Sequence, residues 1–167
     1  MFRYERPQKG RKRQFFQAGA ELIGEESTKS DVEIILLAKT ILEKLNVKYT
    51  LEINYLGKED SLNSYRSYLR KYLQNFKDEL SEKVYSRLQR NPIRAIDSKD
   101  NNIQEIFKKA SDISDFLKKE EKESFERTIK SLKDLKIDFN LNKNLVRGLD
   151  YYTGTVFEFT VDGLGAQ

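Results

Sequence analysis

The spacing of apolar residues changes twice along this 167-residue chain, and that change limits the folds open to it. Near both ends apolar and polar residues alternate, which is typical of strands that bury one face. Between about 58 and 137 the apolar residues recur at helical spacing instead. We therefore predict an α+β fold: a partial domain with an antiparallel sheet, residues 1–57 and 138–167, interrupted by a mostly helical insertion, residues 58–137.

The first third of the chain is predicted to hold four elements. These are strands at 2–5 and 14–23, a largely buried helix at 34–45, and a strand at 49–55. The first two strands would form a hairpin, because the loop between them is polar and contains Pro7 and Gly10. Ser30, followed three residues later by Glu33, forms a capping-box pattern before the helix, with Ser30 as the cap.

The remaining two thirds predict helices followed by strands. The expected helices cover 62–88, 103–118 and 120–136, and the expected strands cover 137–141 and 151–161. Asn91-Pro92 should stop the first helix, since the residue before a proline disfavours helical geometry.

The composition excludes several kinds of site. The chain has no histidine and no cysteine, so Ser-His-Asp triads, Cys-His pairs and thiolate zinc sites are ruled out. Any catalysis must use carboxylates, Arg, Lys, Tyr or a bound metal ion. No apolar run approaches the roughly 18 residues of a membrane span, and the first residues do not resemble a signal peptide. We expect a cytoplasmic protein with no membrane partner.

Positive charge is concentrated near the start of the chain. The net charge is only +4, which by itself fits a solvated, lysine-rich surface. Six cations nevertheless crowd one short segment beside a single carboxylate, Glu5: Arg3, Arg6, Lys9, Arg11, Lys12 and Arg13. Such a loop can close over a triphosphate or RNA, and a solvated turn is the alternative.

Pairing of the two N-terminal strands would create a polar face. Side chains two apart in a strand share a face, which would group Arg3 and Glu5 with Phe15, Gln17, Gly19 and Glu21. This face is too polar for a core. It can grip an amino acid and a nucleotide together, with Arg3 on a phosphate and Phe15 stacked on a base. An exposed sheet surface is the alternative, and composition alone leaves both open.

The segment FRYERPQKGRKRQFFQAGAE resembles motif 2 of class II aminoacyl-tRNA synthetases in its histidine-specific form. The resemblance implies that Arg3 contacts the α-phosphate of ATP and Glu5 the adenine side, while Phe15 packs on adenine. It places Arg11 on the phosphates or on the acceptor end of the tRNA.

The same resemblance implies that Gln17 and Glu21 contact histidine. One departure is Phe16, where the family usually has a histidine. Because position 16 of a strand points away from the face of Gln17, we expect little change in substrate binding.

A second segment, RGLDYYTGTVFE, begins at Arg147. Taken by itself, a pair of tyrosines in a strand more often serves packing than chemistry, and an Arg-Gly pair is weak evidence for a functional site. The whole stretch nevertheless resembles the histidine-specific signature of these synthetases, and the following LGAQ resembles the start of their next motif. The resemblance implies that Arg147 acts on the α-phosphate from the side opposite Arg3, without a protein-bound metal. Tyr151 and Tyr152 would line the histidine pocket, with Tyr152 sharing the imidazole with Glu21.

The helical middle resembles the insertion domain of bacterial-type histidyl-tRNA synthetases, most recognisably in RLQRNPIRAIDSK. The resemblance implies contact with the acceptor arm of the tRNA. Locally basic character supports this reading: Arg66, Arg70, Lys71, Arg87, Arg90 and Arg94. A solvated helical lid is the alternative.

Together the resemblances predict a histidine–tRNA ligase that uses ATP with Mg²⁺, takes histidine and tRNA(His) as partners, and forms a homodimer at full length. The alternatives are a catalytically silent regulatory subunit of histidine biosynthesis and a plain RNA-binding module. The family's motif 1, motif 3 and anticodon-binding domain are not found in these residues, so we expect residues 1–167 alone not to charge tRNA.

Overall fold

The structure is a computed structural model that describes residues 1–4, 6–7, 12–24, 27–96, 98, 100–146 and 152–161. The elements follow the chain as α1 (Thr28–Lys44), β1 (Thr50–Tyr55), α2 (Glu59–Leu73), η1 (Gln74–Glu79), α3 (Glu82–Arg90), η2 (Pro92–Ala95), α4 (Asn101–Phe107), η3 (Ile113–Asp115), α5 (Lys119–Asp134), β2 (Asn140–Leu141) and β3 (Thr155–Thr160), where η marks a 3₁₀ helix. Within the described residues, no helix is long and apolar enough to cross a membrane.

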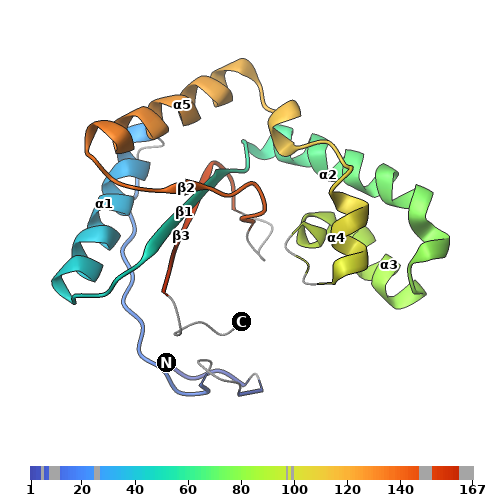
Figure 1. The fold of residues 1–167 in the computed structure, drawn as a ribbon, viewed down its shortest axis with the longest axis horizontal. Coiled ribbons are helices and arrows are strands. Elements are labelled where there is room, and N and C mark those ends of the chain that lie inside the picture. Colours follow the sequence, from blue (N-terminus) through green and yellow to red (C-terminus); the bar gives the residue numbers. More distant parts are fainter. Residues whose placement is uncertain are drawn as a thin grey trace.

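Two parts lie side by side: a sheet with α1 and α5, and a group of shorter helices containing α2, α3 and α4 (Figure 1). We call residues 58–117 the helical lobe. The α+β fold is therefore confirmed, with the sheet formed by segments that are far apart in the sequence.

The strands are ordered β2-β1-β3. β1 and β3 pair antiparallel along their full lengths, from Thr50 opposite Thr160 to Tyr55 opposite Thr155. The strand predicted at 137–141 contracts to two residues, which run parallel to β1. The contraction follows from the end of α5, because Lys136 has a φ of 54° and the Ile137 N–H donates to Leu132 O (2.9 Å).

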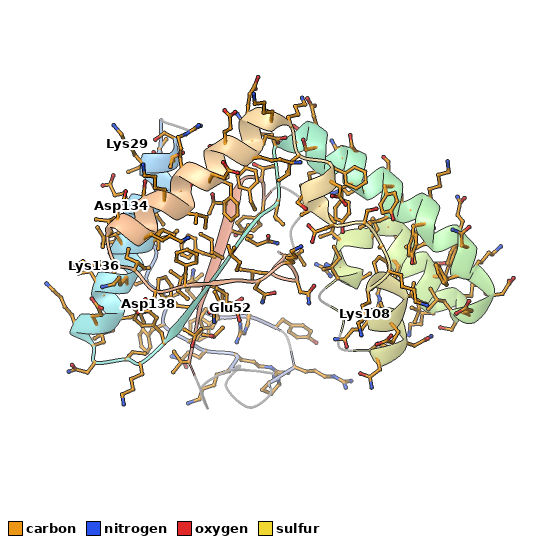
Figure 2. All side chains as sticks on the ribbon, turned by 45° about the horizontal axis from the view of Figure 1, so that its top comes forward. Lys29, Glu52, Lys108, Asp134, Lys136 and Asp138 are labelled. Atoms are coloured by element: carbon orange, nitrogen blue, oxygen red, sulfur yellow. The ribbon has the colours of Figure 1, made fainter. Side chains whose placement is uncertain are left out.

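Helices α1 and α5 cross over the sheet and enclose one core. Its buried members are Val32, Ile35, Leu51, Ile53, Leu132 and Ile137. Lys29 near the start of α1 and Asp134 at the end of α5 lie on the same side of the molecule (Figure 2). This core fixes α1 and α5 to the sheet.

The expectation that the helix at 34–45 is largely buried is wrong. Only one stripe of α1 packs against α5 and β1, and Val32 and Ile35 are its buried residues. Four apolar residues of the helix and its C-cap are exposed: Leu36, Leu37, Ile41 and Leu45. We call these four residues the α1 apolar face.

The predicted helix cap is also displaced. Ser27, not Ser30, caps α1, because the Ser27 hydroxyl accepts the Ser30 N–H (3.3 Å) and the helix starts one turn earlier. Ser30 therefore lies inside the first turn, where its own hydroxyl meets that of Ser27 (3.0 Å).

The prediction of a single helix over 62–88 is wrong, because the chain leaves helical geometry at Phe76 (φ −118°, ψ 17°). A new helix, α3, begins after Ser81, whose hydroxyl accepts the Val84 N–H (3.4 Å). The break does not disturb the apolar spacing, since the Phe76 ring contacts the Tyr72 ring at a tilt (centroids 5.1 Å apart) and Leu80 packs against the next core cluster.

The later helix predictions fare better. α3 ends at Arg90 and Pro92 opens a 3₁₀ helix, so the predicted stop is confirmed. α5 confirms the helix expected at 120–136. The helix expected at 103–118 is divided between α4 and η3.

The helical lobe leaves and rejoins the rest of the chain at neighbouring points, both held by Glu121. Its carboxylate accepts hydrogen bonds from the Lys58 N–H (2.5 Å), the Ser61 hydroxyl (2.5 Å) and the Lys118 N–H (2.6 Å). Glu121 is only 4% exposed, and its pairing satisfies a carboxylate that would otherwise be costly to bury. One side chain thus joins the start of α2 to the start of α5.

The N-terminal segment forms a much smaller hairpin than predicted. Phe2 and Gln14 form an isolated antiparallel bridge, and the Arg3 N–H donates to Arg13 O (2.9 Å). Phe15 also exchanges two main-chain hydrogen bonds with Met1 (2.7 and 3.1 Å), but residues 16–23 pair with no described strand, so the strand predicted at 14–23 is not formed.

Candidate functional site

Arg3 and Phe15 meet at the N-terminal hairpin, as the pairing of their segments predicts. The Arg3 guanidinium carbon lies 4.6 Å from the centre of the Phe15 ring, and Arg3 Nε donates to Lys12 O (2.9 Å). Together with Lys12, Gln14 and Phe16 they line an open hollow of about 670 Å³. A cation held over an aromatic ring offers charge for a phosphate and a flat surface for a base.

Gln17 and Glu21 are exposed on the extended segment that runs from this hairpin toward α1 (Figure 1). The segment is not a strand within the described residues, so the common face predicted for Phe15, Gln17 and Glu21 is not set by a sheet. Their joint action on histidine stays a prediction.

A second open hollow, of about 560 Å³, lies where this extended segment reaches α1 and β3. It is lined by Ala20, Leu22, Gly24, Ser27, Ser30, Asp31, Ile34, Thr155 and Phe157. Glu21 lies in sequence between two of these lining residues. The structure therefore brings the end of the first predicted site segment to the start of β3, where the second segment continues.

The start of β3 is anchored on both sides. The Thr155 hydroxyl donates to the Asp31 carboxylate (2.6 Å), which ties β3 to the first turn of α1. Gly154, with a φ of 69°, donates its N–H to Gly57 O (2.8 Å) at the end of β1. Tyr152, two residues before Gly154, is 41% exposed.

Four predicted site residues lie outside the described residues: Glu5, Arg11, Arg147 and Tyr151. Their proposed roles therefore stay predictions. Of the rest, the structure joins Arg3 to Phe15 and leaves Gln17, Glu21 and Tyr152 exposed.

The structure also shows polar residues that the sequence reasoning missed. Asp31 holds Thr155, and Asn54 is buried in β1. Asn54 leaves a signal in the sequence, because an asparagine inside the apolar strand LEINYL is disfavoured unless its amide has partners.

The basic residues of the helical lobe divide into two groups. Arg70 joins α2 to α3, since its Nε donates to Gln89 O (3.0 Å) while Gln89 Nε2 donates to Arg70 O (3.1 Å). Arg66 is half-buried and donates to Asn63 Oδ1 (3.0 Å). The other four predicted cations, Lys71, Arg87, Arg90 and Arg94, have exposed side chains.

No group of three or more His, Cys, Asp or Glu side chains among the described residues is arranged to hold a metal ion.

Comparison with known proteins matches the whole chain, residues 1–167, to the family model of histidyl-tRNA synthetase. The "Histidine--tRNA ligase" of Acaryochloris marina is 47% identical over 100% of this chain and 39% of its own length. The protein of the same name from Wolbachia pipientis is 47% identical over 99% of this chain and 41% of its own. The chain thus spans about two fifths of the curated relatives that it matches.

Among solved structures, the apo histidyl-tRNA synthetase of S. aureus is 34% identical and superposes with a TM-score of 0.65. The match covers 81% of this chain and 32% of that chain.

Proposed function

Because the chain belongs to the histidyl-tRNA synthetase family, whose model matches it from end to end, we propose that the protein carrying it attaches histidine to tRNA(His). The reaction has two steps. Histidine and ATP first give histidyl-adenylate and pyrophosphate, and the histidyl group then passes to the tRNA with release of AMP.

Activation depends on charge stabilisation. An oxygen of the histidine carboxylate attacks the α-phosphorus of ATP, and the bond from that phosphorus to the oxygen bridging the β-phosphate breaks, releasing pyrophosphate. The α-phosphate gathers negative charge, which guanidinium groups at Arg3 and Arg147 stabilise without proton transfer. The placement of Arg3 over Phe15 supports this assignment, since it presents a cation beside a surface for adenine.

Histidine selection is assigned to Gln17, Glu21, Tyr151 and Tyr152. A carboxylate and a phenol can bond the two imidazole nitrogens and discriminate against isosteres that lack them. The support is the hollow that joins the Glu21 segment to the start of β3. Glu5 and Arg11 complete the proposed ATP-binding site, and Mg²⁺ is expected to bind together with the ATP phosphates.

We assign residues 1–57 and 138–167 to the catalytic part and residues 58–137 to the insertion. Within that range α5 packs on α1 and β1, and the preceding helices form the lobe. The exposed cations of the lobe are the proposed contact for the tRNA acceptor arm. A homodimer and a cytoplasmic location complete the proposal.

ATP–pyrophosphate exchange tests the activity in the full-length protein that carries this chain. We expect exchange that saturates with histidine and is absent with other amino acids. Exchange that ignores histidine would overturn the ligase assignment. No exchange at all would favour the silent regulatory subunit, and RNA binding without exchange would favour the RNA-binding module.

A further inference from the structure

Asn54 is a buried amide in the middle strand of the sheet. It lies in β1 between Ile53 and Tyr55 and is only 9% exposed. Its Nδ2 donates to two main-chain carbonyls, Lys143 O (3.2 Å) and Leu145 O (3.0 Å). Both donors of the amide are therefore used on one short segment that is some ninety residues away in the sequence.

That segment is a tight turn from Asn142 to Leu145. The Leu145 N–H donates to Asn142 O (3.0 Å), and the Asn144 N–H donates to Asn142 Oδ1 (2.9 Å). This is the pattern of a β-turn reinforced by an asparagine side chain. We call residues 142–145 the pinned turn.

Three successive residues of β1 hold the pinned turn. The Asn142 N–H donates to Ile53 O (3.0 Å), and Asn142 Nδ2 donates to Glu52 Oε2 (2.7 Å). Asn54 supplies the third attachment. Figure 2 shows the two parts on either side of the turn, with Glu52 on the sheet and Lys108 on the helical lobe.

The helical lobe holds the opposite side of the turn. Lys143 Nζ pairs with Asp112 Oδ2 (3.0 Å), and Leu145 is buried in a core cluster with Ile93 and Ile113. Asn54, Asp112 and Lys143 also line a cavity of about 140 Å³ between the lobe and the sheet. The turn is therefore fixed from two directions.

We propose that Asn54 is a positioning residue for the activation step: it fixes the main chain of the pinned turn, from which the Arg147 segment continues two residues later. This inference rests on the proposed function, because it assigns Asn54 to the arginine that acts on the α-phosphate. Leu145, the last residue of the anchored turn, precedes Arg147 by two residues in the sequence. An apolar side chain in place of Asn54 could fill the core but would leave two carbonyls without donors.

The simpler reading is that Asn54 only stabilises the fold. The two readings differ in what a substitution does to each correctly folded molecule. A structural role changes how many molecules are active, whereas a positioning role lowers the rate of each active molecule and leaves substrate affinity unchanged.

The test compares Asn54→Asp with wild type in the full-length protein. The substitution keeps the shape but replaces the donating nitrogen with a carboxylate oxygen, which faces both turn carbonyls. Active sites are counted by the burst of histidyl-adenylate, and exchange is expressed per active site. We expect kcat per site to fall between about 10- and 100-fold, since small misplacement of a reacting group has this effect. The KM values for histidine and ATP should change less than about twofold.

A second variant guards against failure to fold. Asn142→Ala removes the side-chain bonds to Glu52 and Asn144 at a half-buried position, and it should give the same kcat loss with unchanged KM values. Asn140→Ala, an exposed asparagine of β2, is the matched control and should behave as wild type.

Unchanged kcat per site in either folded variant would overturn the positioning role, and so would a loss confined to the number of active sites. Histidine-dependent exchange by wild type is scored separately. Failure of the ligase assignment is therefore distinguishable from failure of this inference.

Discussion

Arg3 and Phe15 illustrate what single residues contribute to the candidate site. Their segments pair through an isolated bridge, which is enough to place the guanidinium over the ring. The sequence could predict this contact because antiparallel pairing of two nearby segments fixes which side chains meet. It could not predict how Gln17 and Glu21 lie, since their orientation depends on a sheet partner that the described residues do not supply.

Replacing Arg147 with Ala tests the second cation of the proposed mechanism. Removing a charge that acts mainly on the transition state should lower the histidine activation rate by about 100-fold or more. The KM for histidine should change far less, and pre-steady-state adenylate formation measures both. A large loss of histidine affinity with an unchanged rate would contradict the assigned role. Arg87→Ala, on the lobe, is the control and should leave adenylate formation intact.

At the scale of elements, the passage from β1 to α2 depends on Gly57. Its φ of 76° is unfavourable for other residues, and an added Cβ would lie 2.7 Å from Leu117 Cδ2 and 3.1 Å from Ser61 Cβ. Gly57→Ala should therefore lower the free energy of unfolding by about 1–2 kcal/mol from the backbone alone. Urea denaturation measures the change. Gly19→Ala, with nothing within 4 Å of the added Cβ, should leave the free energy of unfolding nearly unchanged. Equal losses of stability in the two variants would refute the argument.

Glu121 gives the same junction a dependence on pH. Burial raises the pKa of Glu121, but hydrogen bonds from Ser61, Lys58 and Lys118 outweigh burial and hold that pKa below its usual value near 4.5. A depressed folded pKa means that the stabilisation is present above the unfolded pKa and is lost as the pH falls through the folded pKa.

Glu121→Gln should lower the free energy of unfolding by about 1–3 kcal/mol near neutral pH, because the amide cannot accept all three hydrogen bonds. The difference from wild type should shrink as the pH falls from about 5 towards 3. Denaturant titrations across this range measure it, with the exposed Glu120→Gln as control. A difference that grows in acid would contradict the sign.

The elements also show where sequence patterns stop being informative. β1 and α5 could be predicted, since their apolar periodicity and their boundaries agree. The break at Phe76 could not, because the apolar side chains on both sides still face the core. The cap at Ser27 could not be predicted either, because Ser30 and Glu33 form the same sequence pattern one turn later.

At the scale of the whole molecule, the α1 apolar face is an exposed apolar surface on a regular helix and its C-cap. Leu45 is 66% exposed, and Leu36, Leu37 and Ile41 also reach solvent. Contiguous exposed apolar area promotes association, so the purified 167-residue chain should self-associate at micromolar concentrations. The double variant Leu37→Gln, Ile41→Gln should reduce light scattering several-fold. Leu135→Gln, an exposed leucine outside this face, is the control; equal reduction by the control would refute the assignment.

The junction at Glu121 has an evolutionary consequence. Since one carboxylate holds the place where the helical lobe departs and the place where it returns, the spacing of these two points does not depend on the length of chain between them. Lengthening the segment between the two points costs little loop-closure entropy, about 0.6 kcal/mol for each doubling of its length. Homologous proteins could therefore gain or lose whole helices between 59 and 117 while the strands on either side keep their register.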